Sequence, residues 1–140
     1  MEMRQDCGLL LKQINDEMRK NANNALRVQD LTLTQLEALM QLEQAPEGQY
    51  SLKELEQILH VAQSTAAGIM SRLEQKGYVE GFGDAGDRRI KLVRITPAGV
   101  ECVHTALHHR AEAEERLLSG LTEAERNIFY MLLQKVRNSL

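Results

Sequence analysis

Helix-capping patterns recur along this chain and predict a mainly helical fold. Three tetrapeptides fit the pattern Ser/Thr-x-x-Glu, and they begin at Thr34, Ser51 and Thr122. In this motif a hydroxyl and a carboxylate each satisfy a backbone N–H that the first helical turn leaves without a partner. Each tetrapeptide opens an apolar stretch with helical spacing. A fourth helix start is indicated by Thr96-Pro97, because proline suits the first helical position.

Apolar periodicity supplies the remaining helices and separates them from a hairpin. Two segments, 78–82 and 90–95, are predicted to be strands, and the turn-rich segment 83–89 joins them through a long tip. A hairpin this small must lie against helices. The fold class predicted is mainly α with a small β-hairpin. The predicted helices cover residues 3–28, 34–44, 52–60, 63–76, 97–118 and 123–138.

Composition excludes several classes of protein. The net charge is −3, and 26% of the residues are charged and 43% hydrophobic, as in ordinary globular proteins. No apolar run approaches the ~20 residues that span a membrane, and no signal-peptide pattern is present. We expect a cytoplasmic protein with two reduced cysteines. Neither a Gly-rich phosphate loop nor a G-x-S-x-G nucleophile motif occurs, so we do not expect an enzyme.

The order of elements in the middle of the chain predicts a helix-turn-helix with a wing. Two short helices meet at a tight turn over residues 59–62, and the hairpin follows them. A helix has the right width for the major groove of DNA, and a hairpin tip can reach the flanking backbone. Residues 88–94 contain four basic side chains and no acidic one. A basic cluster in an acidic protein is typical of a surface that faces a partner, although many such clusters are simply solvated.

This middle region resembles the MarR family, the multiple-antibiotic-resistance regulators. The segment from Asp87 to Gly99 matches the family's wing pattern of Asp-x-Arg, a strand and then L-T-x-x-G, with Ile95 in place of leucine. Residues 63–65 and 72–79 match its recognition helix and the exit from it, and the likeness covers almost the whole chain. The resemblance implies a homodimeric winged helix-turn-helix transcriptional regulator, often a repressor that a small ligand or an oxidant releases. It also implies that Arg89 is the wing arginine and that Asp87 holds it in place.

The resemblance also implies a division of the chain and a partner. We expect a dimerisation helix at residues 1–30, a DNA-binding lobe at 31–98 and C-terminal dimerisation helices at 99–140, all in one interwoven domain. The chain ends carry apolar stripes that a winged core this small cannot cover, which favours a homodimer. Double-stranded DNA is the expected partner, with a small-molecule effector. The stripes consist of Leu10, Ile14 and Met18 in the first helix and Ile128, Met131, Leu132 and Val136 in the last.

Helical spacing predicts which face of the recognition helix meets DNA. Ala66, Ile69, Met70 and Leu73 share one face, which we expect to be buried. The opposite face is small and polar, and Gly68 stands where a larger reader is common. We therefore expect specificity to depend more on DNA shape and phosphate contacts than on base contacts. The candidate DNA-binding residues are Gln63, Ser64, Thr65, Ala67, Gly68, Ser71, Arg72, Asp87, Arg88 and Arg89.

Two sensor chemistries are alternatives to this interpretation, and the first is metal sensing. His104, His108 and Glu112 are spaced so that pairs of them share a helix face, but one helix does not complete a metal site. Glu37 would be a further ligand, yet we assign it to a capping box. We therefore predict no metal and no cofactor.

A thiol-based redox sensor is an alternative that depends on Cys7. The peroxide-sensing branch of the resembled family uses a thiol in the first helix, but that branch also has tyrosines that this helix lacks. We expect Cys102 to lie in the core. A protein-docking winged helix without sequence-specific DNA binding also stays open, since the recognition helix is rich in Gly and Ala. A purely structural helical dimer would leave the hairpin unexplained.

Overall fold

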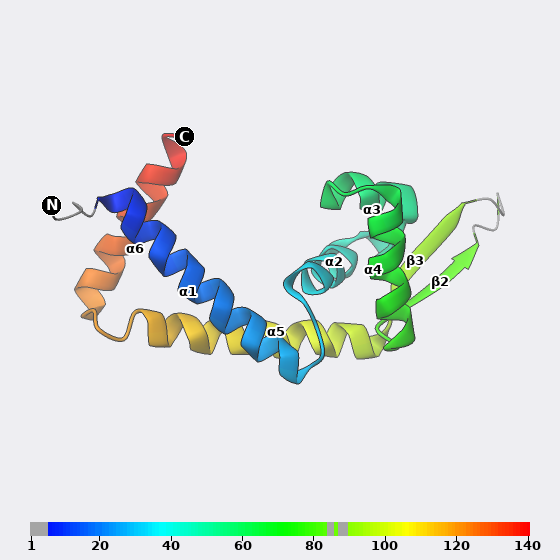
Figure 1. Cartoon of the computed structure of the whole chain (residues 1–140), viewed down its shortest axis with the longest axis horizontal. Coiled ribbons are helices and arrows are strands. Elements are labelled where there is room, and N and C mark those ends of the chain that lie inside the picture. The colour runs from blue at the N-terminus through cyan, green and yellow to red at the C-terminus, as the bar shows by residue number, and fades with distance from the viewer. Residues whose placement is uncertain (1–5, 84–85, 87–89) are drawn as a thin grey trace, which may run out of the picture. The chain divides into compact units, whose positions relative to one another are not determined.

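The computed structural model describes residues 6–83, 86 and 90–140, and it confirms the predicted fold class (Figure 1). It divides into two compact units, residues 1–106 and 107–140, which are described separately. None of the described helices is long and apolar enough to cross a membrane. In chain order the elements are α1 (Cys7–Val28), α2 (Leu33–Gln44), the 3-10 turn η1 (Pro46–Gly48), β1 (Gln49–Ser51), α3 (Leu52–Leu59), α4 (Gln63–Gln75), β2 (Val79–Gly83), β3 (Lys91–Ile95), α5 (Pro97–Leu117) and α6 (Glu123–Asn138).

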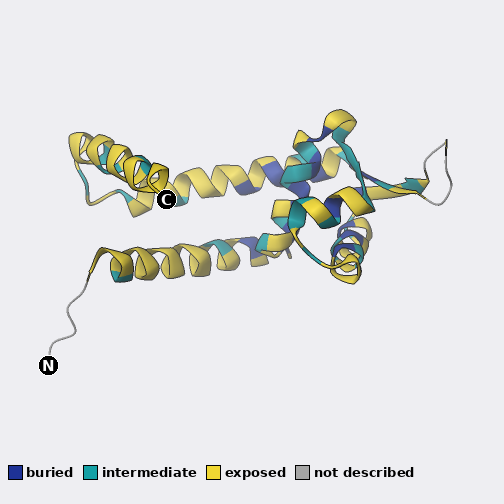
Figure 2. Cartoon of the chain, turned by 90° about the horizontal axis from the view of Figure 1, so that it is seen from above, coloured by how far each residue is buried: buried dark blue, intermediate teal, exposed yellow. Residues whose placement is uncertain are grey.

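The core of the first unit forms where α2, α3 and α4 pack with the sheet and the start of α5. Its largest fully buried side chains come from four different helices. The buried segments in Figure 2 gather around these elements, while most of α1 is exposed. Burial of apolar surface at about 25 cal/mol per Å² is the main force that holds these helices together. The fully buried large residues are Leu39, Leu42, Leu55, Leu73 and Val103.

A three-stranded antiparallel sheet takes the place of the predicted two-stranded hairpin. The strand order is β1-β3-β2, with Tyr50 opposite Val93 on one side of β3 and Phe82 opposite Leu92 on the other. The sequence did not predict β1, because three residues are too few to show a period of two. Val93 and Ile95 are buried, so alternate positions of the central strand face the core.

One predicted helix cap is wrong, because a different pair of residues caps the start of α2. The capping box of α2 consists of Thr32 and Gln35, not Thr34 and Glu37. The Thr32 N–H donates to Gln35 Oε1 at 3.2 Å, and the Gln35 N–H donates to Thr32 Oγ1 at 3.2 Å. Both tetrapeptides fit the pattern Ser/Thr-x-x-Glu/Gln. The observed choice buries Leu31 just before the helix.

The other helix starts follow the capping chemistry with small differences. The box at Thr122 and Glu125 is present, and the N–H of Thr122 lowers the pKa of the Glu125 carboxyl. Ser51 caps α3 by accepting a hydrogen bond from the Glu54 N–H at 3.1 Å. The first helix begins at Cys7 rather than near residue 3, because Asp6 Oδ1 accepts the Leu9 N–H at 2.8 Å.

The second unit contains the end of α5 and the whole of α6. Arg126 joins them: its guanidinium lies 2.7 Å from Glu115 Oε1 and also donates to the Leu118 carbonyl at 3.1 Å. No residue of α6 is buried. Leu132 and Met131 are 51% and 59% exposed, so this helix presents an uncovered apolar surface.

Candidate nucleic-acid interface

The two faces of α4 are as the spacing predicted. Ala66, Met70 and Leu73 are buried in the core, and Ile69 is half-buried beside them. The opposite face is open over the full length of the helix, and a Cβ added at Gly68 would meet nothing within 4 Å. The exposed predicted residues are Gln63, Ser64, Thr65, Gly68, Ser71 and Arg72, with Ala67 half-buried among them.

The turn before α4 leaves the first turn of that helix without a side-chain cap. His60 ends α3 in the left-handed conformation at φ 54°, and the chain then enters α4 through Val61 and Ala62. Ala62 makes no capping hydrogen bond, as expected for a residue without a polar side chain. Backbone N–H groups at the start of α4 are therefore open to water or to an anionic partner.

Arg94 of β3 contacts the neighbouring strands of the sheet and is not part of a free basic surface. Its guanidinium donates to Gln49 Oε1 at 3.2 and 3.0 Å, lies 3.6 Å from Glu80 Oε1 and stands 4.5 Å above the Phe82 ring. These contacts join β1, β3 and β2. The sequence places Arg94 in the basic cluster at residues 88–94, whereas in the structure its guanidinium contacts the sheet.

The wing is attached to α4 as well as to the sheet. Glu74 of α4 accepts the Gly81 N–H of β2 at 3.3 Å. The predicted tip residues Asp87, Arg88 and Arg89 lie outside the described residues. The strands β2 and β3 and the helix α4 therefore form one connected surface.

The segment Ile95-Thr96-Pro97-Ala98-Gly99 joins the wing to α5, and its contacts account for the residue types at Thr96 and Gly99. Thr96 Oγ1 accepts the Gly99 N–H at 3.1 Å, which caps α5, and the same hydroxyl donates to the Gly77 carbonyl at 2.6 Å. The Thr96 N–H donates to the Tyr78 carbonyl at 3.0 Å. A Cβ at Gly99 would overlap that carbonyl oxygen, so only glycine fits there.

The histidines of α5 contact separate carboxylates. His104 Nε2 lies 2.7 Å from Glu43 Oε1, and His108 Nε2 lies 3.1 Å from Glu112 Oε1. Among the described residues, no group of three His, Cys, Asp or Glu side chains is arranged to hold a metal. Glu37 is not a capping residue, so a capping role does not exclude it as a metal ligand.

The two cysteines differ in environment. Cys7 is exposed near the start of α1, and Cys102 lies in the core, as predicted. Burial raises the pKa of the Cys102 thiol, and the smaller opposing effect of the Tyr78 hydroxyl does not cancel it. A buried, protonated thiol is a poor nucleophile, so Cys102 is a packing residue.

A helix with an open polar face, braced by α3 and followed by a hairpin, defines a winged helix-turn-helix protein. The MarR family model matches residues 31–91. The multiple antibiotic resistance protein MarR of Salmonella typhimurium is 29% identical over 131 residues, which are 92% of this chain and 89% of that protein. The uncharacterised HTH-type regulator YwaE of Bacillus subtilis is 27% identical over 93 residues, which are 66% of this chain but only 54% of that protein.

Solved structures agree over nearly the whole chain. Wild-type MarR from E. coli in its apo form superposes with a TM-score of 0.80 at 25% identity, covering 96% of this chain and 98% of that one. The S. aureus MepR–DNA complex superposes with a TM-score of 0.72 at 26% identity, covering 98% and 100%. Residues 31–91 therefore match the MarR family, and the chain is similar to proteins described as transcriptional regulators.

Proposed function

We propose that this protein binds pseudo-palindromic duplex DNA as a homodimer in the cytoplasm, represses transcription and is released by a small-molecule effector. The open face of α4 carries the proposal. Its polar and small side chains stand away from a core that holds the helix rigidly from behind. A helix mounted in this way suits the major groove, and a similar protein, MepR, has been solved in complex with DNA.

The proposed contacts divide by role. Ser64, Thr65 and Ser71 offer hydroxyls to base edges, and Ala67 offers a methyl that suits thymine. Arg72 and the uncapped first turn of α4 suit phosphates. Arg88 and Arg89, with Asp87 beside them, are assigned to the flanking DNA on the strength of the sequence pattern.

The dimer follows from the apolar surfaces at both chain ends. Leu10, Ile14 and Met18 of α1 are 44%, 39% and 48% exposed, and the stripe on α6 is exposed as well. Such stripes are costly to leave in water, and a second copy of the chain is the natural cover for them. Two recognition helices related by a dyad would then meet major grooves about one turn, ~10 bp, apart. This arrangement assigns residues 1–30 and 99–140 to dimerisation and 31–98 to DNA.

A cavity of about 420 Å³ is the place we propose for an effector. It adjoins α4, so a molecule bound in it would contact the helix proposed to read DNA. Ligands that bind one conformation better than another shift the balance between them. The cavity is lined by Arg27, Asp30, Leu31, Thr32, Gln35, Arg72, Gln75 and Lys76.

The test is selection of a binding site from random duplexes, followed by footprinting. We expect protection of two half-sites with their centres about 10 bp apart. Protection of a single half-site would contradict the dimeric mode. Binding that shows no sequence preference over bulk DNA would favour the protein-docking alternative instead.

Replacing Arg89 by alanine is expected to weaken operator binding across all sequences. If Arg89 contacts a phosphate, the slope of log K against log salt should fall by about 1, because one fewer counterion is released. The measurement is a salt titration of the selected duplex with wild type and Arg89→Ala. Arg110→Ala removes an equal charge from exposed α5 and should leave the slope unchanged. Unaltered affinity in Arg89→Ala would refute the wing assignment.

A further inference from the structure

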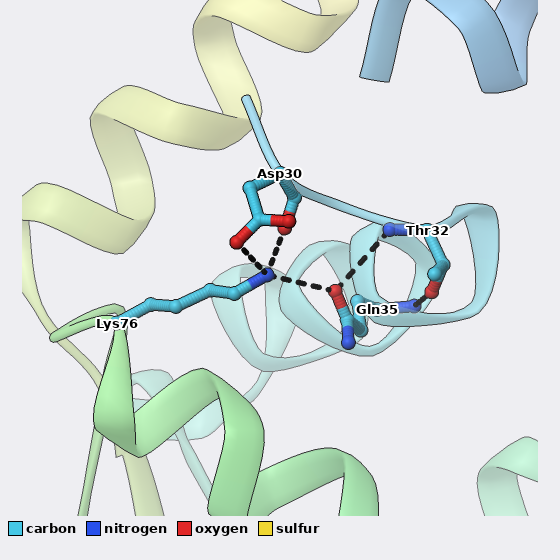
Figure 3. A network of polar contacts seen from close by, with 4 residues as sticks. All are labelled: Asp30, Thr32, Gln35 and Lys76. Atoms are coloured by element: carbon cyan, nitrogen blue, oxygen red, sulfur yellow. Dashed lines mark hydrogen bonds and ion pairs between the residues drawn. The ribbon is translucent and has the colours of Figure 1, made fainter. Parts of the chain in front are cut away.

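The ammonium group of Lys76 lies where three helix ends meet (Figure 3). It donates to the backbone carbonyl of Asp30 and to Gln35 Oε1 at 3.3 Å, and it lies 3.7 Å from Asp30 Oδ2. Of the three donors of the ammonium, two meet acceptors at hydrogen-bond distance, and the Asp30 carboxylate, whose side chain is 96% exposed, stands at ion-pair distance. The Lys76 side chain is only 23% exposed. Lys76 is therefore held in place rather than solvated as a surface lysine.

Asp30 is the residue that terminates α1. It adopts the left-handed conformation at φ 54°, its N–H donates to the Arg27 carbonyl at 3.0 Å, and the Leu31 N–H donates to the Leu26 carbonyl at 3.0 Å. This is the Schellman ending, in which the left-handed position usually carries glycine. The flanking Leu26 and Leu31 are both buried in the core. The end of α1 is thus fixed in the fold, and its left-handed residue is the one that Lys76 binds.

Gln35 connects the same lysine to the start of α2. Its side chain is buried, at 5% exposed, and Oε1 accepts from both the Thr32 N–H and Lys76 Nζ. Buried polar atoms in native proteins are almost always hydrogen-bonded, and leaving one unpaired is costly. The lysine therefore adds a second donor to a buried oxygen that already caps the first turn of α2.

The backbone of Lys76 is as well defined as its side chain. Lys76 is the C-cap of α4, Gly77 follows it at φ 78°, and the Tyr78 N–H donates to the Leu73 carbonyl at 3.0 Å. This is a second Schellman ending. The contact to Asp30 therefore runs from the defined end of one helix to the defined end of another.

We infer that Lys76 is a positioning residue for DNA recognition: by binding Asp30 and Gln35 it fixes the end of α4 against the end of α1 and the start of α2, and so sets the half-site spacing that the dimer accepts. The inference rests on the proposed function, because it takes α4 as the recognition helix and α1 as part of the dimer interface. It assigns to Lys76 no contact with DNA.

Half-site spacing is the property that this junction should control. Apolar packing holds the inner face of α4 in the core, and the directed hydrogen bonds of Lys76 add a constraint at the end of the helix. In a dimer, the angle between α4 and α1 decides where the two recognition helices stand relative to each other. One added base pair moves a half-site by ~3.4 Å and turns it by ~35° around the DNA axis. A rigid dimer should therefore reject duplexes that are one base pair too long or too short.

The test is a series of duplexes that carry the selected half-sites at the best spacing and at one and two base pairs on either side. Wild type should prefer the best spacing over its neighbours by at least about tenfold, or about 1.4 kcal/mol. Lys76→Met keeps the length of the side chain but loses the ammonium. It should lose about tenfold at the best spacing and much less at the others, so that the preference falls below about threefold.

Three controls separate positioning from charge and from folding. Lys76→Arg keeps donors and charge and should retain the preference. Lys12→Met removes a lysine that pairs with Asp16 on the exposed surface of α1, and it should change all spacings equally. Thermal melts establish that each variant is folded, and Lys76→Gln replaces Lys76→Met if the latter does not melt cooperatively.

The outcomes are distinct. A wild-type preference retained in folded Lys76→Met overturns the inference alone, and so does an equal loss of preference in Lys12→Met. Wild type that binds specifically but tolerates every spacing also overturns it. Wild type that binds none of the duplexes specifically overturns the proposed function and this inference together.

Discussion

Gly99→Ala is expected to lower the free energy of unfolding by at least about 2 kcal/mol, as overpacking of a rigid site does. The new methyl group would overlap the Tyr78 carbonyl oxygen and crowd the Ile95 side chain. The carbonyl cannot retreat, because it accepts the Thr96 N–H at 3.0 Å in the turn that joins the wing to α5. The strain therefore falls on the backbone and not on a flexible side chain. Urea denaturation at a fixed protein concentration measures the loss.

Gly68→Ala is the matched control for this prediction. Both glycines are helical, so both substitutions gain about 1 kcal/mol of helix propensity. The Cβ at Gly68 enters open space, and this variant should be more stable than wild type by about that amount. The two substitutions should therefore have effects of opposite sign. Equal effects in both would show that the contact between Gly99 and Tyr78 does not constrain the fold.

Capping residues made the helix starts predictable, except at α2, where two capping patterns overlap. The start of α6 at Glu123 follows from the Thr122 box and was predicted to the residue, and the helix ends at Asn138, close to where it was expected to end. At α2 the sequence offers Thr32 with Gln35 and Thr34 with Glu37, and both pairs satisfy the same local rule. The fold selects the pair that buries Leu31 and lets Gln35 meet Lys76. That selection depends on α4, which lies about forty residues further along the chain.

Long-range pairing accounts for the other features that the sequence did not reveal. The strand β1 is recognisable only because Gln49 faces Arg94 across the sheet. Lys76 and Asp30 each look like an ordinary surface charge, since no local pattern links residues so far apart. Arg94 was misread for the same reason. Its partners Gln49, Glu80 and Phe82 lie on the two neighbouring strands, β1 and β2, whereas its position in the sequence suggested the basic cluster.

The candidate interface was predictable in its most regular part. The period of 3.6 residues separates Ala66, Met70 and Leu73 from the outward face of α4, and burial follows that division. No such rule applies to the wing tip, where the predicted roles of Asp87 and Arg89 come from a resemblance. These residues therefore remain a prediction that the salt titration tests.

Leu132→Glu is expected to abolish the dimer at micromolar concentration and with it high-affinity operator binding. Leu132 is 51% exposed and lies within the apolar surface of α6, together with Ile128 and Val136. If that surface is buried against a second chain, an unpaired carboxylate there costs several kcal/mol, and the dimer dissociation constant should rise at least about a hundredfold. A monomer holds one half-site only, so operator affinity should fall by at least a similar factor. Sedimentation velocity and a gel shift measure the two effects.

Arg137→Glu separates the position of the new charge from its sign. Arg137 is exposed on α6 and lies at least about 100° around the helix from every member of the apolar stripe, so a carboxylate there stays in water if the apolar face is the one covered. This variant should remain dimeric and bind the operator as wild type does. Circular dichroism should show both variants folded, because α6 contributes no buried residue to the unit that contains it. A dimeric Leu132→Glu with wild-type affinity would place the interface elsewhere, and a wild-type chain that sediments as a monomer would contradict the dimer itself. A single carboxylate at the centre of the apolar stripe on α6 should therefore abolish both dimer assembly and high-affinity DNA binding, while the fold survives.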